Sequence, residues 1–383
     1  MTTFDPSLRL DEASKFGPPR LRIACVYQRY RISDLILGTM AGIRFFRMAE
    51  ALARRGHEVD ILLNRLETPQ PLAPRLREVP FKLVRWENYQ AVKTFFHHGF
   101  ESLVAEGGGD HPFIISKLGS VVGREQTDGV HFYGAVREKL YRTQLKIAQR
   151  AKVVTVLTNP SAALWWDEHG TDSTLFQVPT GVDAEIPPPA ATPYHSLGIT
   201  GPVALFAGNI YSREQQPEIN ALWQQRLNQL GRALKRRGIT LVAIGAGVTD
   251  LLEPDAVTHV GVVDVSEYWN WQHHAQVGIV LAQGPVQDNE SSKIYYYLRT
   301  GLPVICESSV PNVGLIEHTG CGAIVPFGDL DAMADASAQQ IAAPRDSAAI
   351  AEYMVANHSW DSRAALYDQV LCPEGPMPRE LAV

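Results

Sequence analysis

The chain has 383 residues, of which 45% are hydrophobic and 20% charged, as in soluble globular proteins long enough for two domains. No apolar run approaches the roughly 20 residues of a membrane-spanning helix, and residues 1–19, which we interpret as a flexible tail, lack the apolar core of a signal peptide. The net charge of −6 is uneven, since residues 1–200 carry 24 basic and 21 acidic side chains and residues 201–383 carry 11 and 20. The basic half suits an anionic partner or a peripheral membrane contact, but two ordinary domains of differing charge explain the asymmetry better. No basic stripe with interleaved aromatic residues indicates nucleic acid.

The first half of the chain alternates strand and helix patterns. Apolar runs, helical spacing and a glycine-containing loop that ends at Gly42 predict a strand–loop–helix–strand unit over residues 21–63. Further strands are expected over 81–85, 111–116, 152–157 and 174–178, and helices over 88–105, 131–150 and 159–169. Four prolines between residues 66 and 80 predict an irregular loop. This order favours a parallel sheet with helices on both faces.

The second half starts the alternation afresh after a proline-rich segment, residues 184–200, which we interpret as an interdomain linker. Strands are expected over 203–207, 240–244, 257–260, 277–281, 303–306 and 323–325, and helices over 217–237, 266–273, 312–318, 329–341, 346–356 and 360–370. The predicted fold class is therefore α/β, with two Rossmann-like doubly wound domains over 20–183 and 201–358 that face a central cleft.

The most informative stretch is Asp-Asn-Glu-Ser-Ser-Lys, residues 288–293. It follows the buried strand expected at 277–281 and forms the loop and first turn of a helix that Gly301 ends. Serine hydroxyls, a lysine and backbone N–H groups at a helix N-terminus favour phosphate binding. An ordinary capped helix would have the same composition, so the stretch alone leaves both interpretations open.

Several segments along residues 20–372 form a recognisable series: Ala41–Arg44, Ala49–Val59, Thr180–Asp183, Phe206–Gly208, Val260–Val263, residues 288–305 and Ser359–Trp360. In their order and spacing these segments resemble the retaining glycosyltransferases of family four, which have the GT-B fold. The resemblance implies metal-independent transfer of a sugar from a nucleotide-diphosphate sugar to an acceptor hydroxyl, with retention of anomeric configuration. It also implies that the first domain binds the acceptor and that residues 359–383 form a helix crossing back to that domain.

The resemblance and the positions in the predicted fold together give the candidate site residues. The catalytic candidates are Asp288, Lys293 and Arg213. The other donor-binding candidates are Gly42, Gly208, Asn209, Val262, Asn289, Glu290, Ser291, Ser292 and Tyr296. The candidates on the acceptor side are Lys117, at the start of a glycine-containing loop of the first domain, and His111 and His131, which flank that loop. A structural role suits both histidines better than a role at the acceptor.

Four positions depart from the family pattern. The second acid of the donor motif, which holds the ribose hydroxyls in the family, falls on Tyr296, and the first falls on Asp288 instead of Glu. Asn209 and Glu214 stand where the family has an Arg and a Lys on the diphosphate, so we expect Arg213 to supply that charge. These departures keep open the alternative of a non-catalytic GT-B scaffold that binds a nucleotide or a protein partner. A third alternative is a nucleotide-sugar epimerase on the same fold.

No spacing of cysteine or histidine residues indicates a metal site, and no cofactor is expected apart from the nucleotide sugar as co-substrate. The four scattered cysteines are interpreted as reduced thiols of a cytoplasmic protein. A basic helix that carries Arg44, Arg47, Arg54 and Arg55 suits either an anionic lipid surface or solvent.

Overall fold

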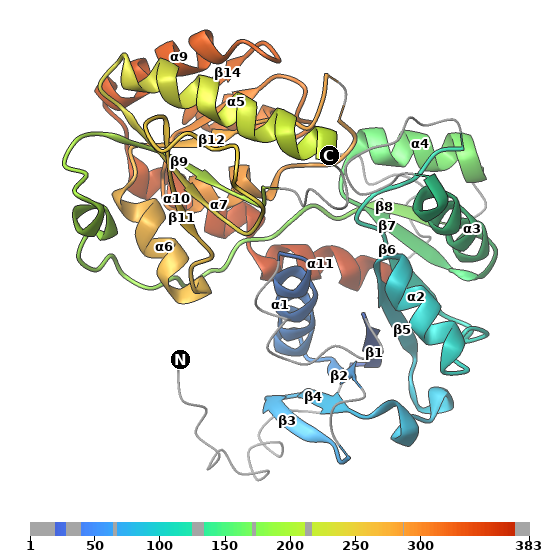
Figure 1. The fold of residues 1–383 in the computed structure, drawn as a ribbon. Coiled ribbons are helices and arrows are strands. Elements are labelled where there is room, and N and C mark those ends of the chain that lie inside the picture. Colours follow the sequence, from blue (N-terminus) through green and yellow to red (C-terminus); the bar gives the residue numbers. More distant parts are fainter. Residues whose placement is uncertain are drawn as a thin grey trace. The chain divides into compact units, whose positions relative to one another are not determined.

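The protein is represented by a computed structural model that describes residues 20–27, 40–63, 67–124, 134–170, 174–210, 217–285 and 287–371. The chain divides into two compact units, the first made by the described residues up to Gly181 together with those from Ser359 onward, and the second by Val182–His358. Each unit contains one sheet with helices packed against it (Figure 1), so the predicted α/β class with two doubly wound domains is confirmed. Within the described ranges no helix is long and apolar enough to cross a membrane.

The first unit is built on an eight-stranded sheet in the order β3-β4-β2-β1-β5-β6-β7-β8. The strands are β1 (Arg22–Val26), β2 (Glu58–Leu62), β3 (Gln70–Ala73), β4 (Leu76–Val79), β5 (Ala91–Phe95), β6 (Ile114–Lys117), β7 (Val153–Val156) and β8 (Thr174–Gln177). All neighbours pair in parallel except β3 and β4. The chain order reverses between β1 and β5, which makes their carboxyl ends the topological switch point of the sheet.

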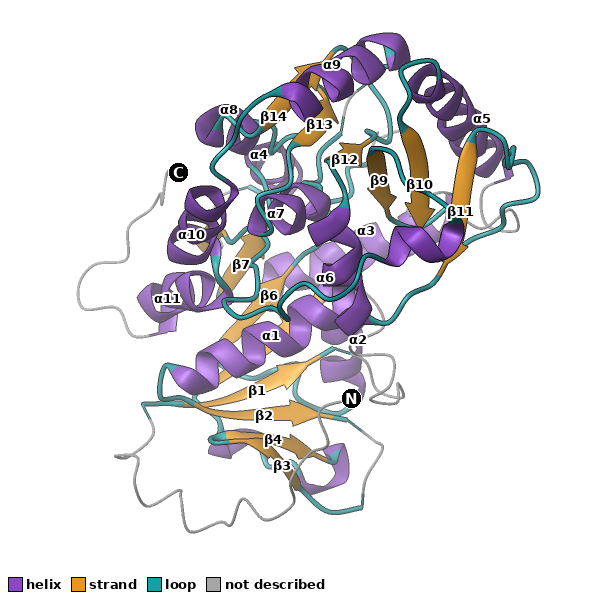
Figure 2. Ribbon diagram, turned by 90° about the vertical axis from the view of Figure 1, so that its left-hand side faces the viewer, coloured by secondary structure: helices purple, strands orange, loops and turns teal. Residues whose placement is uncertain are grey.

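Helices cover both faces of this sheet (Figure 2). One apolar cluster joins one face to α1 (Met40–Arg54) and α11 (Trp360–Leu371). A second cluster joins the other face to α2 (Phe96–Ala105), α3 (Gly134–Arg150) and α4 (Asn159–His169). Successive side chains of a strand point to opposite faces of the sheet, so neighbours such as Ile23 and Ala24 belong to different clusters.

Three local predictions for this unit are wrong. The helix expected over 88–105 is strand β5 followed by α2, and all five residues of β5 are buried. A short apolar run is compatible with helix or strand, and only its place between β1 and β6 decides the outcome. The segment 81–85, expected to be a strand, contains the 3₁₀ turn Phe81–Leu83. The segment 66–80, expected to be a loop, contains the β3–β4 hairpin. Pro71 is tolerated in β3 because β3 is an edge strand.

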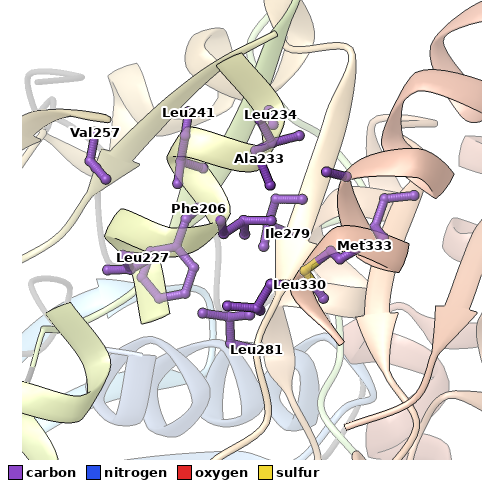
Figure 3. Packing of buried hydrophobic residues seen from close by; sticks show 14 of the residues in the cluster. Phe206, Leu227, Ala233, Leu234, Leu241, Val257, Ile279, Leu281, Leu330 and Met333 are labelled. Atoms are coloured by element: carbon purple, nitrogen blue, oxygen red, sulfur yellow. The ribbon is translucent and has the colours of Figure 1, made fainter. Parts of the chain in front are cut away.

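The second unit has a six-stranded parallel sheet in the order β11-β10-β9-β12-β13-β14. The strands are β9 (Val203–Ala207), β10 (Thr240–Ile244), β11 (Val257–Gly261), β12 (Val277–Val280), β13 (Val304–Glu307) and β14 (Gly322–Val325). Helices α5 (Pro217–Lys235) and α9 (Leu330–Ala342) bury one face in the cluster of Figure 3, where Phe206, Leu227, Ile279 and Met333 meet. The remaining helices are α6 (Val265–His274), α7 (Ser292–Arg299), α8 (Gly314–Thr319) and α10 (Ser347–His358).

The proline-rich segment 184–200 belongs to the second unit and is fixed to it by hydrogen bonds. The Tyr194 hydroxyl donates to the Trp271 carbonyl at 2.7 Å. Arg299, at the end of α7, donates to the carbonyls of Asp183 and Ala184, both at 2.7 Å. The role of this segment as an interdomain linker stays a prediction.

Helix α11 completes the first unit through one buried carboxylate. Asp368 accepts hydrogen bonds from Arg20 at 2.8 Å, from Arg55 at 2.6 Å and from His57 Nε2 at 2.8 Å. Burial acts to raise the pKa of Asp368, but the hydrogen bonds from His57, Arg55 and Arg20 outweigh it and hold the pKa below its ordinary value. The Asp368 carboxylate therefore links α11 to Arg20, before β1, and to the turn that follows α1.

We expect Asp368→Asn to lower the free energy of unfolding of the first unit by about 2–4 kcal/mol, because three donors lose a buried anionic acceptor. The control is Asp361→Asn on the same helix, whose ion pair with Arg54 at 2.9 Å is exposed on both sides. That change should cost no more than about 0.5 kcal/mol. Urea denaturation of both variants measures the difference, and equal destabilisation would show that Asp368 does not anchor the helix.

Candidate functional site

The loops at the carboxyl edge of the second sheet lie against one another. The Gly208 N–H, just after β9, donates to the Ile244 carbonyl at 2.8 Å, and the Gly245 N–H donates to the Gly261 carbonyl at 2.9 Å. Gly245 has φ +149°, and a Cβ there would lie 2.0 Å from the Gly208 carbonyl oxygen. Glycine is thus needed at Gly245 for the loops after β9 and β10 to meet.

Lys293 lies across the end of β9. Its Nζ is 5.3 Å from the centroid of the Phe206 ring, and a Cβ at Gly208 would lie 2.5 Å from Lys293 Cε and 2.9 Å from Nζ. Burial lowers the pKa of Lys293 to about 8, with the Cys306 thiol acting weakly in the opposite direction. Within the described ranges no carboxylate forms an ion pair with this lysine, so its charge is available to an anion.

The residue directly before α7, Ser291, is fixed by hydrogen bonds to a side chain. Asn312 fixes Ser291 on both sides, because its Oδ1 accepts from the Ser291 N–H at 2.8 Å and its Nδ2 donates to the Ser291 carbonyl at 3.1 Å. The Ser291 N–H, which the sequence suggested as a phosphate donor, therefore already has a partner. The N–H groups of Ser292 and Lys293, in the first turn of α7, are the ones that suit an anion.

Tyr297 positions Lys293, although no sequence pattern singled this tyrosine out. Its hydroxyl donates to the Leu205 carbonyl at 3.0 Å and accepts from the Ala207 N–H at 2.8 Å, so it takes the place of a strand neighbour along β9. The ring passes over Gly278 of β12, where a Cβ would lie 2.3 Å from it. Lys293 precedes Tyr297 by four residues on the same helix face, and anchoring one therefore places the other.

The remaining donor candidates occupy different environments. Tyr296 is 3% exposed, and its ring stacks on Trp269 of α6 with centroids 5.2 Å apart. Its ring belongs to the packing between α6 and α7, and its contact with a ribose stays a prediction. Val262, directly after β11, is 73% exposed, as suits a residue that lies against a nucleotide base. The other members are half-buried Asp288 and Asn289, buried Glu290 and exposed Asn209.

In the first unit the structure brings Lys117 together with a residue that the sequence did not reveal. Lys117 ends β6 and lines a pocket with Lys93 of β5. Gly42 is buried in the first turn of α1. His111 precedes β6 and so lies at the amino ends of the strands, away from the pocket. Its Nδ1 accepts a hydrogen bond from the Phe113 N–H at 3.1 Å, which is a local structural contact.

The catalytic candidate Arg213, its neighbour Glu214 and the acceptor-side candidate His131 lie outside the described residues.

Comparison with known proteins places this geometry in a fold family. No family model and no curated protein matches the chain. Among solved structures, sucrose-phosphate synthase from Thermosynechococcus elongatus is 16% identical with a TM-score of 0.64, over 92% of this chain and 98% of that one. Anabaena HepE in complex with UDP and glucose is 12% identical with a TM-score of 0.65, over 92% and 99%. WaaG, a glycosyltransferase involved in lipopolysaccharide biosynthesis, is 14% identical with a TM-score of 0.58, over 92% and 100%.

These likenesses extend over nearly the whole chain and establish its fold. The chain has the GT-B fold, as its resemblance to the retaining glycosyltransferases of family four implied.

We expect Tyr297→Phe to lower the free energy of unfolding of the second unit by about 1–3 kcal/mol, because the Ala207 N–H and the Leu205 carbonyl lose their partner in a dry interior. Tyr353→Phe on α10 is the matched control, since the Tyr353 hydroxyl makes no hydrogen bond within the described part of the chain. Its cost should stay within about 0.5 kcal/mol. Chemical denaturation compares the two, and a Tyr297→Phe variant as stable as the control would contradict the bridging role of the hydroxyl.

Proposed function

We propose that the chain is a glycosyltransferase that moves a sugar from a nucleotide-diphosphate sugar to an acceptor hydroxyl, with retention of configuration and without a metal ion. The observation that carries this proposal is the position of Lys293, which lies over Gly208 at the carboxyl edge of a doubly wound sheet and beside the N-terminus of α7. A lysine charge together with first-turn N–H groups that have no hydrogen-bond partner among the described residues suits a diphosphate.

Donor recognition follows from this arrangement. Lys293 and the N–H of Ser292 bind the diphosphate in this proposal, and Arg213 adds a second positive charge. The base lies along exposed Val262, and Asp288 orients the sugar hydroxyls. HepE, which has the same fold, was solved in complex with UDP and glucose, and this supports a nucleotide donor here.

In the proposed glycosyl transfer, the protein has to stabilise the leaving diphosphate and does not need to supply a nucleophile. The sugar–phosphate bond breaks through a state with oxocarbenium character, and negative charge develops on the diphosphate. The Lys293 ammonium, half-buried against Phe206, neutralises that charge more strongly than it would in water. In the proposed front-face attack, the leaving phosphate accepts the proton of the acceptor hydroxyl.

The acceptor is proposed to bind the first unit and is a glycan, a lipid-linked compound or a small molecule. Contact with a membrane through α1 stays a prediction, and the pairing of Arg47 with Glu50 and of Arg54 with Asp361 shows that two of its arginines have carboxylate partners within the unit. The three described cysteines are free and buried, which fits the proposed cytoplasmic location.

Lys293→Ala should weaken binding of a nucleoside diphosphate by about tenfold to a hundredfold, because one charge-assisted contact to phosphate is lost. The control is Lys235→Ala in the same unit, whose exposed ammonium donates to the Asp255 carbonyl at 3.0 Å and should not affect binding. Isothermal titration calorimetry with UDP, GDP, ADP and TDP measures the affinities and identifies the base. Unchanged affinity in Lys293→Ala would rule out the proposed donor site.

The lowered pKa of Lys293 predicts a pH dependence of this binding. Below a pKa of about 8 the lysine is already charged in the free protein, whereas above it the bound diphosphate must draw a proton onto the amine. Affinity should therefore fall about tenfold between about pH 7 and pH 9. Calorimetry in buffers of different ionisation enthalpy should detect proton uptake on binding near pH 8.5 in the wild type and none in Lys293→Ala; equal uptake in both would assign the proton elsewhere.

Turnover separates the alternatives. A glycosyltransferase should slowly hydrolyse its donor in the absence of an acceptor and release the nucleoside diphosphate, whereas a non-catalytic scaffold should release none. An epimerase would return a changed sugar nucleotide without any acceptor. The replacement of the second family acid by Tyr296 is the observation that keeps the scaffold in consideration.

A further inference from the structure

Residues 282–285 and 287–291, termed the donor loop, lie between β12 and α7 and start at a buried ion pair. The Ala282 N–H donates to Glu307 Oε2 at 2.6 Å, and the Ala282 carbonyl accepts from Arg226 Nη1 at 2.9 Å. Arg226 Nη2 donates in turn to Glu307 Oε1 at 2.5 Å. Glu307 is fully buried and Arg226 is 9% exposed. One charged pair therefore holds both backbone polar groups of the first residue of the donor loop.

This ion pair joins several elements of the second unit. Glu307 is the last residue of β13, and its Oε1 also accepts from the Gly328 N–H, after β14, at 2.8 Å. Arg226 belongs to α5, and its guanidinium lies 5.1 Å from the centroid of the Phe327 ring. Apolar side chains of the same volume often stabilise a protein at least as well as a buried ion pair. The property that apolar side chains lack is directional hydrogen bonding, which here fixes the backbone after β12 and after β14.

Two more side chains of the segment that follows β13 hold the donor loop. The Ser309 hydroxyl donates to the Gly284 carbonyl at 2.7 Å. Asn312 binds both the N–H and the carbonyl of Ser291. Strands β12 and β13 are parallel neighbours, so their carboxyl ends lie at the same edge of the sheet. Residues 307–312 therefore contact the donor loop at its first, third and last residues.

The donor loop and Lys293 are anchored by different parts of the unit. The donor loop carries Asp288, which the proposed function assigns to the sugar hydroxyls. Lys293, which the proposed function assigns to the diphosphate, is placed by the hydrogen bonds of Tyr297 to β9. The two halves of the candidate donor site therefore depend on separate sets of hydrogen bonds.

We infer that Glu307 and Ser309 are positioning residues for the sugar half of the donor. Neither touches the donor; both fix the backbone of the donor loop so that Asp288 meets the sugar hydroxyls without reorganisation when the donor binds. Asn312 holds the loop where it joins α7 and so borders on both halves of the site. The inference rests on the proposed function, because a chain that binds no nucleotide sugar has no sugar to position.

The test compares Ser309→Ala with Ser309→Thr, which keeps the hydroxyl, and with Ser308→Ala as the control. Ser308 is exposed, and its backbone N–H, which the substitution retains, donates to the Val325 carbonyl at 2.8 Å. All three changes leave the buried ion pair intact, so these variants should fold like the wild type.

Two quantities are measured for each full-length variant. Calorimetry gives the Kd of UDP, GDP, ADP and TDP, and a donor-hydrolysis assay without acceptor gives kcat for the hexose, N-acetylhexosamine and hexuronic acid derivatives of the nucleotide that binds most tightly. Ser309→Ala should lower kcat for the best donor about tenfold and change the Kd of the nucleoside diphosphate by less than about twofold, because only the sugar half loses its support. Ser309→Thr and Ser308→Ala should match the wild type in both quantities. Glu307→Gln should show the same split as Ser309→Ala together with a lower unfolding temperature, because Arg226 loses its counter-charge.

Hydrogen exchange of the free protein shows whether Ser309 acts through the loop. Backbone amides of the donor loop should exchange faster in Ser309→Ala than in the wild type, and those of α7 should not. Faster exchange with an unchanged kcat would overturn the inference, since the position of the loop would then not affect the sugar. A lower kcat without faster exchange would overturn it as well, because Ser309 would then act on the donor directly, and so would an equal loss of nucleoside diphosphate affinity.

The failure of this inference differs from the failure of the proposed function. A wild-type protein that binds no nucleoside diphosphate and hydrolyses no donor would remove the proposed function, and the inference with it. Wild-type hydrolysis that Ser309→Ala leaves unchanged would overturn the inference alone.

Discussion

The Tyr297 hydroxyl is the contact on which the candidate donor site depends. It bridges the Leu205 carbonyl and the Ala207 N–H, so helix α7 is fixed to the strand that ends at Gly208. Gly278 gives the tyrosine ring the space to reach that strand, and Gly208 gives the Lys293 side chain the space to lie across its end. The position of Lys293 therefore depends on the buried hydrogen bonds of Tyr297, which lies one helical turn further along α7.

Both units place a lysine against aromatic rings near the carboxyl ends of their strands. Lys293 lies over Phe206, and Lys93 lies near Tyr367 and Phe95. In each case burial lowers the pKa of the lysine to about 8, so the charge persists at neutral pH at a cost in stability. Natural proteins keep such costly groups mainly at functional sites, so their burial marks both lysines as candidates for a functional role.

Much of the fold was predictable, because it depends on short-range patterns. Apolar runs bounded by glycine and proline indicated most strands, and helical spacing indicated α5, α9 and α11 to within a few residues. The failures fell where the local pattern is ambiguous. The segment from Ala91 onward has the composition of either element, and its pairing with β1 and β6 makes it a strand.

The sequence by itself determined the two doubly wound sheets and the position of Lys293 at a helix N-terminus, because periodicity and helix-capping residues are properties of neighbours along the chain. Only the tertiary structure decided what surrounds these residues. It brought Lys93 to Lys117, set Gly208 beneath Lys293 and buried Tyr296 against Trp269, although these partners are separated by 24 or more positions in the sequence. Such contacts depend on strand order and on which face a side chain takes, and strand order is set by the packing of the whole unit.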